Sequence, residues 1–397
     1  MRRLPAVCLL ALLPLGGALP AGAVADDAAA VTAAERAAIL ALGPWPPAFR
    51  RDPSNRVSGR PLAIELGRRL FHDPRMSPIG YIGCVTCHQP DRSFTDNKAR
   101  AHGLADLPRN TIALANLSQQ RWFGWGGSSD SLWMASLRPM LDAREFGSEP
   151  AIVVRVFQRD EELARCYRAV FGRSPGGAAE GVMVNVAKAL AAYQETLVSD
   201  RTAFDDFRDA LARGDAAAQA RYPAAAARGL RLFVGRLGCV ACHAGPNFSD
   251  GGFHRASAAS AASAASAASA ASAASAQSAA AVDAGRAQGL RDWQGSRYNR
   301  RGAYNDDPLH RPAAAPPGEG GPGAFRTPGL RNVVFTAPYL HDGSLDTLRE
   351  ATLHAVALAA GAPPPAPTQL DDLLAFLASL ADRHGERRPA PAPRPCP

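Results

Sequence analysis

The sequence predicts a mainly α-helical protein with two domains, and three observations support this prediction. Apolar residues recur at helical spacing in several stretches, whereas the strict alternation typical of half-buried strands is scarce. The chain of 397 residues is long enough for two domains of ordinary size, each with its own core. A five-residue motif, Cys-x-x-Cys-His, occurs once in each half of the chain, directly after a segment with helical periodicity. We therefore expect one copy of the motif in each domain.

The two copies of the motif are Cys84–His88 and Cys239–His243. Two thiols three positions apart can form thioethers with the two vinyl groups of haem, and the histidine after the second thiol can bind the iron. A structural zinc pair and a redox dithiol are the alternatives, but the histidine in both copies favours covalent haem c. The predicted haem-binding residues are Cys84, Cys87, His88, Cys239, Cys242 and His243.

Residues 1–25 have the three zones of a secretory signal peptide. Arg2 and Arg3 supply the positive charge, residues 7–19 form an apolar run, and small residues precede a cleavage site near Ala25. The apolar run is short and is broken by Pro14, so a retained membrane anchor is the less favoured alternative. Because bacteria attach haem c outside the cytoplasmic membrane, the motifs agree with export, and we expect a periplasmic protein.

The formal net charge of the chain is +8. Cleavage of the signal removes Arg2 and Arg3, and the propionates of two haems add negative charge, so the mature holoprotein should lie roughly two charges above neutral. A basic surface for nucleic acid is therefore not expected.

The elements are predicted in the following order. Residues 26–60 form an N-terminal strap with one helical segment, Ala33–Leu42, followed by an extended stretch rich in proline. The first domain covers residues 61–220, and its helices include Leu62–Phe71, Ala151–Phe171 and Val184–Leu197, with another beginning near Phe204. The second domain covers residues 221–385 and begins with the helix Ala226–Val234.

Two further segments lack the composition of a packed core. Residues 256–281 are a Ser-Ala-Ala repeat without bulky apolar side chains, and we expect a mobile surface insertion there. Residues 386–397 are rich in proline and are expected to be a disordered tail. Cys166 lies in a helical run and is predicted to be a buried, small apolar side chain, with a disulfide to Cys396 as the alternative.

Longer stretches of the sequence resemble the bacterial di-haem cytochrome c peroxidases and their MauG-type relatives. The matching stretches are Leu66–Leu70, Phe94–Asp96, Arg109–Thr111, Trp122–Trp125, Pro139–Gly147, Phe248–Gly251 and Phe325–Ser344. The resemblance covers most of residues 55–380. It implies two cytochrome c-like domains packed face to face, each with one covalent haem c, of which the first reacts with peroxide and the second transfers electrons.

The resemblance assigns roles to two residues of the first domain. Trp125 matches the tryptophan that passes electrons between the haems, although Gly126 replaces the acid that follows it in the family. Glu145, twenty residues further on, matches the catalytic glutamate, and a carboxylate above a haem can take a proton from peroxide and return it to the leaving oxygen. Without the resemblance, a core tryptophan and a solvated glutamate paired with Arg138 or Arg144 are the alternatives. Ala135 stands where many relatives have a glutamine.

The sixth ligand of each iron stays open at this stage. His102 matches a histidine that ligates the oxidised first haem in the peroxidases, with an exposed loop histidine as the alternative. At the second haem, the family's methionine or tyrosine position corresponds to Ala355, and every methionine lies at or before Met183. His354 is the weak candidate, and His254, Tyr339 or an empty site are the others. A histidine or tyrosine ligand would give this haem a lower potential than methionine does.

The resemblance also implies a Ca²⁺ site between the domains. The family uses an asparagine side chain and two backbone carbonyls, which correspond to Asn110, Thr336 and Pro338. Oxygen ligands of this kind suit Ca²⁺. From the residues alone, Asn110 would be interpreted as a turn residue.

Three functions are compatible with these features. The leading hypothesis is a di-haem peroxidase that reduces hydrogen peroxide with electrons from a small periplasmic cytochrome c or cupredoxin. The second is a MauG-like enzyme that oxidises a residue of a partner protein, which the absent methionine and glutamine favour. The third is a di-haem electron carrier without peroxide chemistry, and Glu145 argues against it. A homodimer is an open alternative for the assembly.

Overall fold

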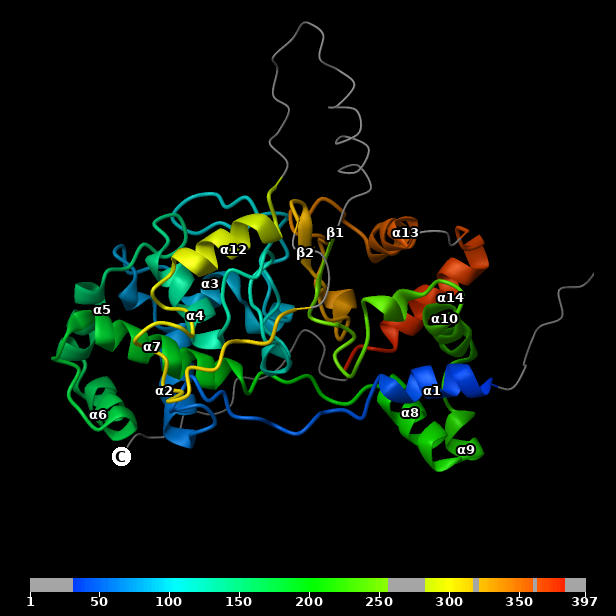
Figure 1. The fold of residues 1–397 in the computed structure, drawn as a ribbon, viewed down its shortest axis with the longest axis horizontal. Helices are drawn as coiled ribbons and strands as arrows, with labels where there is room; N and C mark the ends of the chain where they lie inside the picture. The colour runs from blue at the N-terminus through cyan, green and yellow to red at the C-terminus, as the bar shows by residue number, and fades with distance from the viewer. Residues whose placement is uncertain (1–30, 256–282, 317–320, 360–362, 383–397) are drawn as a thin grey trace, which may run out of the picture.

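The computed structural model describes residues 31–255, 283–316, 321–359 and 363–382, and this part of the chain is mainly helical (Figure 1). The predicted signal peptide (1–25), the Ser-Ala-Ala insertion (256–281) and the tail (386–397) lie outside the described residues. Within the described ranges, none of the helices combines the length and the apolar character needed to cross a bilayer.

The described helices form two lobes, and each lobe surrounds its own hydrophobic core (Figure 1). The first lobe contains α2 (Pro61–His72), α3 (Cys84–Cys87), α4 (Leu132–Leu141), α5 (Pro150–Arg159), α6 (Glu161–Phe171), α7 (Ala179–Gln194) and α12 (Arg286–Gly295). The second lobe contains α1 (Ala33–Ala41), α8 (Ala203–Arg213), α9 (Ala216–Gln219), α10 (Ala224–Val234), α13 (Leu348–Leu358) and α14 (Pro367–Ala378). Short 3₁₀ helices lie at Pro74–Met76, Pro90–Arg92, Leu117–Gln119, Cys239–Ala241 and Val333–Phe335.

Each lobe is centred on two helices that cross at a glycine. A Cβ atom on Gly67 of α2 would lie 1.9 Å from the carbonyl oxygen of Ala189 on α7. A Cβ atom on Gly229 of α10 would lie 2.0 Å from the carbonyl oxygen of Asp372 on α14. Only glycine permits helices to approach this closely. The Cys-x-x-Cys-His segment that follows α2 or α10 then packs on the core of the same lobe.

The helices leading into the two motifs were predicted correctly. The predicted helix Leu62–Phe71 corresponds to α2, and Ala226–Val234 corresponds to α10. The predicted helix over 151–171 is two helices, α5 and α6, because the Asp160 side chain accepts a hydrogen bond from the Leu163 amide (2.9 Å) and begins a new helix.

The division into lobes differs from the predicted boundary at residue 220. Phe204 and Phe207 of α8 are buried in the core of the second lobe, as is Ile39 of the predicted strap. Trp293 of α12 is instead buried in the core of the first lobe. Each lobe therefore takes part of its core from a distant segment of the chain, because apolar faces pack wherever they find a matching surface.

The extended stretch after α1, part of the predicted strap, crosses from the second lobe to the first (Figure 1). It is fixed at its far end by Glu195, a residue with 6% exposure that follows α7. The Glu195 carboxylate accepts hydrogen bonds from the Ser58 hydroxyl (2.9 Å) and the Gly59 amide (3.2 Å). Burial raises the pKa of Glu195 to about 7.

A two-stranded antiparallel sheet lies between the lobes (Figure 1). It pairs β1 (Phe253–Arg255) with β2 (Ala324–Arg326), with Phe253 opposite Arg326. The backbone amide of Arg326 also donates to the carbonyl of Trp125 (2.8 Å). The sheet therefore connects the chain after the second motif to the first lobe.

Cys166 is buried on α6 with 1% exposure, as predicted, but it is disulfide-bonded. Its interpretation as a simple apolar side chain was therefore incomplete. Cys396, the alternative partner considered from the sequence, lies outside the described residues.

Candidate haem sites and the interdomain cavity

The first motif forms a single helical turn that places its histidine against the protein. The His88 amide donates to the carbonyl of Cys84 (2.9 Å), and the His88 Nδ1 atom lies 3.2 Å from the carbonyl oxygen of Phe94. This contact orients the ring and leaves Nε2 as the nitrogen that can bind a metal. Burial lowers the pKa of His88, so the ring stays neutral, as a metal ligand requires.

The second motif repeats this arrangement. The His243 amide donates to the carbonyl of Cys239 (2.9 Å), and the His243 Nδ1 atom lies 3.0 Å from the carbonyl oxygen of Phe248. Burial again lowers the pKa of the histidine. Both phenylalanines whose carbonyls hold the rings have a positive φ, 61° for Phe94 and 53° for Phe248. The same local backbone therefore positions both histidines.

The thiols of the motifs do not fit the alternative of a redox dithiol. Burial raises the pKa of Cys84 to about 12, of Cys87 to about 11 and of Cys239 to about 11, and it also raises the pKa of Cys242. A catalytic dithiol instead needs a lowered pKa. Among the described residues, no three or more His, Cys, Asp or Glu side chains are grouped so that they could hold a metal ion.

A cavity between the lobes connects the surroundings of the two motifs. Its walls include Ile112 from the first lobe and Pro328 from the second, and the carbonyls of these residues interact with His88 and His243 respectively. The side-chain oxygens of Thr111 and Gln120, which also line the cavity, are buried without a hydrogen-bond partner. Unpaired polar atoms next to two oriented histidines fit the polar edge of a bound haem.

Trp125 lies at the junction of the lobes. Its indole nitrogen donates to the carbonyl of Asn110 (2.9 Å), its own carbonyl accepts from Arg326, and the residue lines the cavity. These contacts place Trp125 between a segment that follows the first motif and the strand β2, and its electron-transfer role stays a prediction.

Glu145 lies near the first motif, in the loop after α4. Its negative charge contributes to the raised pKa of Cys87, so the two side chains are close enough to interact. The loop packs against residues 101–106, where the Leu104 amide donates to the Glu145 carbonyl (3.1 Å), and a Cβ on Gly103 would meet that carbonyl at 2.5 Å. Burial raises the pKa of Glu145, although Arg138 lies 3.3 Å from its carboxylate. The side chain is 24% exposed.

His102 is placed beside the first motif by its backbone, since the Cys87 thiol lies 3.7 Å from the His102 carbonyl. Its side chain is 58% exposed, and Nδ1 lies 2.6 Å from the carboxylate of Asp106. The imidazole is therefore held by a partner on the surface of this loop.

The second lobe offers no methionine as a haem ligand, in agreement with the sequence. Met76, Met134, Met140 and Met183 are all buried in the core of the first lobe. Among the other candidates, His354 is half-buried on α13, next to the exposed Ala355. The Tyr339 hydroxyl donates to the Val333 carbonyl (3.0 Å), and burial raises the pKa of this tyrosine to about 12. His254 on β1 pairs with Asp250 (2.8 Å).

The three residues proposed for Ca²⁺ line the same cavity. The Asn110 amide donates to the His341 carbonyl (2.8 Å), and its side-chain nitrogen donates to the Lys98 carbonyl (2.8 Å). With the side-chain nitrogen directed at Lys98, the amide oxygen is the atom of Asn110 that remains available to a cation.

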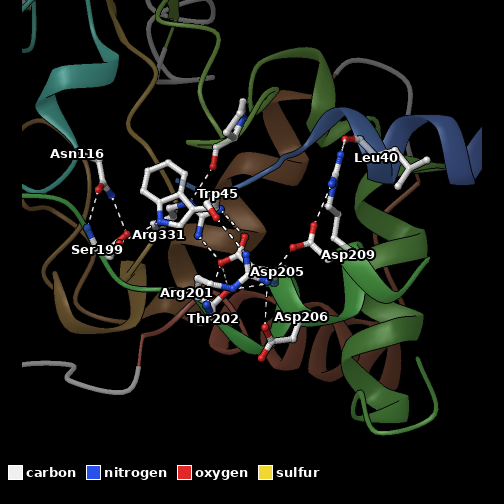
Figure 2. A network of polar contacts seen from close by, with 12 residues as sticks. Leu40, Trp45, Asn116, Ser199, Arg201, Thr202, Asp205, Asp206, Asp209 and Arg331 are labelled. Atoms are coloured by element: carbon white, nitrogen blue, oxygen red, sulfur yellow. Dashed lines mark hydrogen bonds and ion pairs between the residues drawn. The ribbon is translucent and has the colours of Figure 1, made fainter. Parts of the chain in front are cut away.

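The sequence alone did not identify Arg326 and Arg331 as residues of the cavity wall. The Arg331 guanidinium is fully buried against Asp205 and Trp45 (Figure 2). A signal for both existed, because they flank Pro328 within a stretch, Phe325–Ser344, that was singled out only as a family match.

Two segments with paired thiols and a histidine oriented through Nδ1, on either side of a shared cavity, are the arrangement typical of a haem protein of the c-type class. A family model described as di-haem cytochrome c peroxidase matches residues 61–213. Methylamine utilization protein MauG of Methylorubrum extorquens is 32% identical over 359 residues, which cover 88% of this chain and 85% of MauG. The chain belongs to the di-haem cytochrome c peroxidase family and is an oxidoreductase.

Two further matches agree with this assignment. Cytochrome-c peroxidase IdrP2 of Pseudomonas sp. (strain SCT) is 28% identical over 333 residues, or 83% of this chain and 80% of the relative. The crystal structure of the diheme peroxidase BthA from Burkholderia thailandensis has the same fold, with a TM-score of 0.62 and 20% identity over 87% of this chain and 90% of BthA.

Proposed function

We propose that the protein is a periplasmic peroxidase that reduces hydrogen peroxide with electrons from a small cytochrome c or cupredoxin. Each lobe is a cytochrome c-like domain in this proposal, and each Cys-x-x-Cys-His motif holds one covalent haem c. The observation that carries the proposal is Glu145, a carboxyl group with a raised pKa beside the first motif. It is supported by the family membership of the chain and by the similarity to named cytochrome c peroxidases.

The haems supply the redox chemistry, and the chain supplies proton transfer and positioning. His88 and His243 would hold the irons through Nε2, because their Nδ1 atoms face backbone carbonyls. Glu145 accepts the first proton of hydrogen peroxide on its carboxylate and returns it to the leaving oxygen, which departs as water. The raised pKa brings Glu145 closer to the working pH, where one group can perform both steps.

Trp125 then serves the transfer of electrons between the two sites. Its hydrogen bond to Asn110 and the bond from Arg326 to its carbonyl fix the indole at the junction of the lobes. A Ca²⁺ ion held by the Asn110 amide oxygen and the carbonyls of Thr336 and Pro338 would join the same two segments. Its role in this proposal is to fix the distance between the domains.

The proposal is tested with the holoprotein and a reduced cytochrome c. We expect peroxide-dependent oxidation of the cytochrome, slowed about 10²- to 10⁴-fold in Glu145→Gln, because glutamine cannot exchange the proton. Glu149→Gln is the matched control, since Glu149 is an exposed glutamate four residues away, and its rate should equal that of the wild type. Turnover no faster than that of free haem would refute the peroxidase, and an unchanged rate in Glu145→Gln would refute the role of Glu145.

A second candidate function is the oxidation of a residue in a partner protein. The similarity of the chain to MauG supports this candidate. It is favoured by the absence of methionine from the described second lobe and by Ala135 at the position of the family's glutamine. In this case the peroxide-treated protein would hold its oxidising equivalents for minutes and would oxidise cytochrome c poorly. Stopped-flow absorption spectra with and without reduced cytochrome c separate the two functions.

A further inference from the structure

Arg326 is a buried cation that has no acidic partner among the described residues. It lies on β2 with 3% exposure and lines the cavity between the lobes. Within the described part of the chain, its guanidinium donates to two backbone carbonyls, those of Gly124 (3.4 Å) and Thr327 (3.3 Å), and both contacts are long. Burial lowers the pKa of Arg326 to about 10, with no carboxylate to offset it.

Two other buried arginines nearby have closer partners, an acid in one case and a carbonyl with two aromatic rings in the other. Arg331 forms two hydrogen bonds with the carboxylate of Asp205, at 2.8 and 2.9 Å. Arg286 donates to the carbonyl of Gly127 (2.8 Å) and lies over the rings of Trp122 and Phe253. Arg326 alone among these three faces a cavity without a charged or aromatic partner, and a buried charge of this kind is costly unless an anion completes the site.

The surroundings of Arg326 point to the second motif as the source of that anion. Two residues further along the chain, the Pro328 carbonyl interacts with the His243 ring. The Thr327 carbonyl accepts a hydrogen bond from Ser249, in the loop that follows this histidine. The backbone of Arg326 is thus fixed to the segments that surround the predicted iron ligand.

We propose that Arg326 forms a buried ion pair, in the cavity, with a propionate of the haem attached at the second motif. Such a pair uses the bidentate geometry that guanidinium and carboxylate groups share. It keeps the propionate ionised beside Trp125 and places a fixed positive charge near the iron. Because ferric iron carries one more positive charge than ferrous iron, this charge favours the reduced state of the second haem. The inference rests on the proposed haem at this motif.

The test is the reduction potential of the second haem in the holoprotein, measured by spectroelectrochemistry. Arg326→Gln should lower the potential, so that the ratio of reduced to oxidised haem at a fixed potential falls on the order of tenfold. Arg326→Lys keeps the charge and should recover part of the loss. Arg121→Gln is the matched control, because Arg121 is an exposed arginine of the loop that carries Gln120 and Trp122, and water screens its charge.

The pH dependence identifies the partner as a carboxylate. The difference between the potentials of wild type and Arg326→Gln should shrink at acid pH, where an unpaired propionate becomes protonated. The other titratable groups on the cavity wall are Arg331, paired with Asp205, and Tyr339, with a pKa of about 12. On the paired strand β1, His254 lies 2.8 Å from Asp250 of the preceding loop, and this pair is present in both proteins, so it cancels in the difference.

Three outcomes would overturn the inference. The first is an equal potential in wild type and Arg326→Gln across the pH range. The second is a potential of the wild type that shifts with added phosphate or acetate while that of the variant does not, which would mean that Arg326 binds a free anion. The third, available if the glutamine variant does not fold, is an unchanged propionate band in the resonance Raman spectrum of Arg326→Lys.

Covalent haem content separates this inference from the function on which it rests. A wild-type chain without haem at the second motif would refute the proposed function. A protein with two haems and an unchanged potential in the variant would refute only the role of Arg326.

Discussion

Replacing Asp205 by asparagine should destabilise the second lobe strongly. The substitution breaks a buried ion pair but keeps the size and shape of the side chain. The carboxylate of Asp205 and the guanidinium of Arg331 are 2% and 0% exposed, and two hydrogen bonds join them (Figure 2). Asp205 also accepts from the backbone amide (2.8 Å) and the hydroxyl (2.9 Å) of Thr202, which completes the capping box of α8. The guanidinium carbon lies 3.7 Å from the centre of the Trp45 ring.

The expected loss in the free energy of unfolding is about 3–5 kcal/mol, the usual cost of leaving one partner of a buried pair uncompensated. Urea denaturation of the holoprotein, followed by circular dichroism, measures it. Asp206→Asn is the matched control, since Asp206 is the next residue, is 61% exposed and pairs with the half-exposed Arg201. The control should change stability by about 1 kcal/mol or less. Equal unfolding midpoints for the two variants would refute this reasoning.

Three other predictions follow from described contacts. Gly229→Ala should destabilise the protein by about 1–3 kcal/mol or more in urea denaturation, because its Cβ would lie 2.0 Å from the Asp372 carbonyl, whereas Gly176→Ala, with no neighbour within 4 Å, should not. In the folded state, the pKa of Glu195 is raised to about 7, so the folded state binds this proton more tightly than the unfolded state does. The contribution of Glu195 to stability is therefore present at acid pH and is lost as the pH rises towards 7. The loss amounts to about 3 kcal/mol, and Glu195→Gln should remove this slope when unfolding is measured between pH 5 and 8; an unchanged slope would contradict the assignment. Trp125→Phe should keep both haems but slow the reoxidation of the second haem by peroxide in stopped-flow spectra, and an unaltered rate would place the electron path elsewhere.

Local pattern was sufficient to predict the helices that lead into the motifs. The apolar spacing in α2 and α10 follows from one face being buried, and this information lies within about ten residues of sequence. The cysteines and histidines of the motifs were likewise identified by their spacing. Glu145, in contrast, was assigned by resemblance, because its closeness to Cys87 depends on a loop contact with Gly103 that no local pattern encodes.

Long-range packing explains what the sequence did not predict. The assignment of α8 to the second lobe depends on Phe204 meeting Phe248 and Phe376, residues distant in sequence. The proposed role of Arg326 likewise rests on its surroundings, because the described residues place no carboxylate beside its guanidinium, and this depends on contacts between distant segments.

The exchange of segments between the lobes has a consequence for dissecting the molecule. Because α1 completes one core from the amino-terminal side and α12 completes the other from beyond the second motif, no single cut in the backbone yields two halves with intact interiors. A fragment ending after α7 would expose the surface that Trp293 normally covers, and a fragment beginning at α10 would lack Ile39 and Phe204. Either half expressed alone should aggregate, whereas the two fragments produced together could restore each other by complementation.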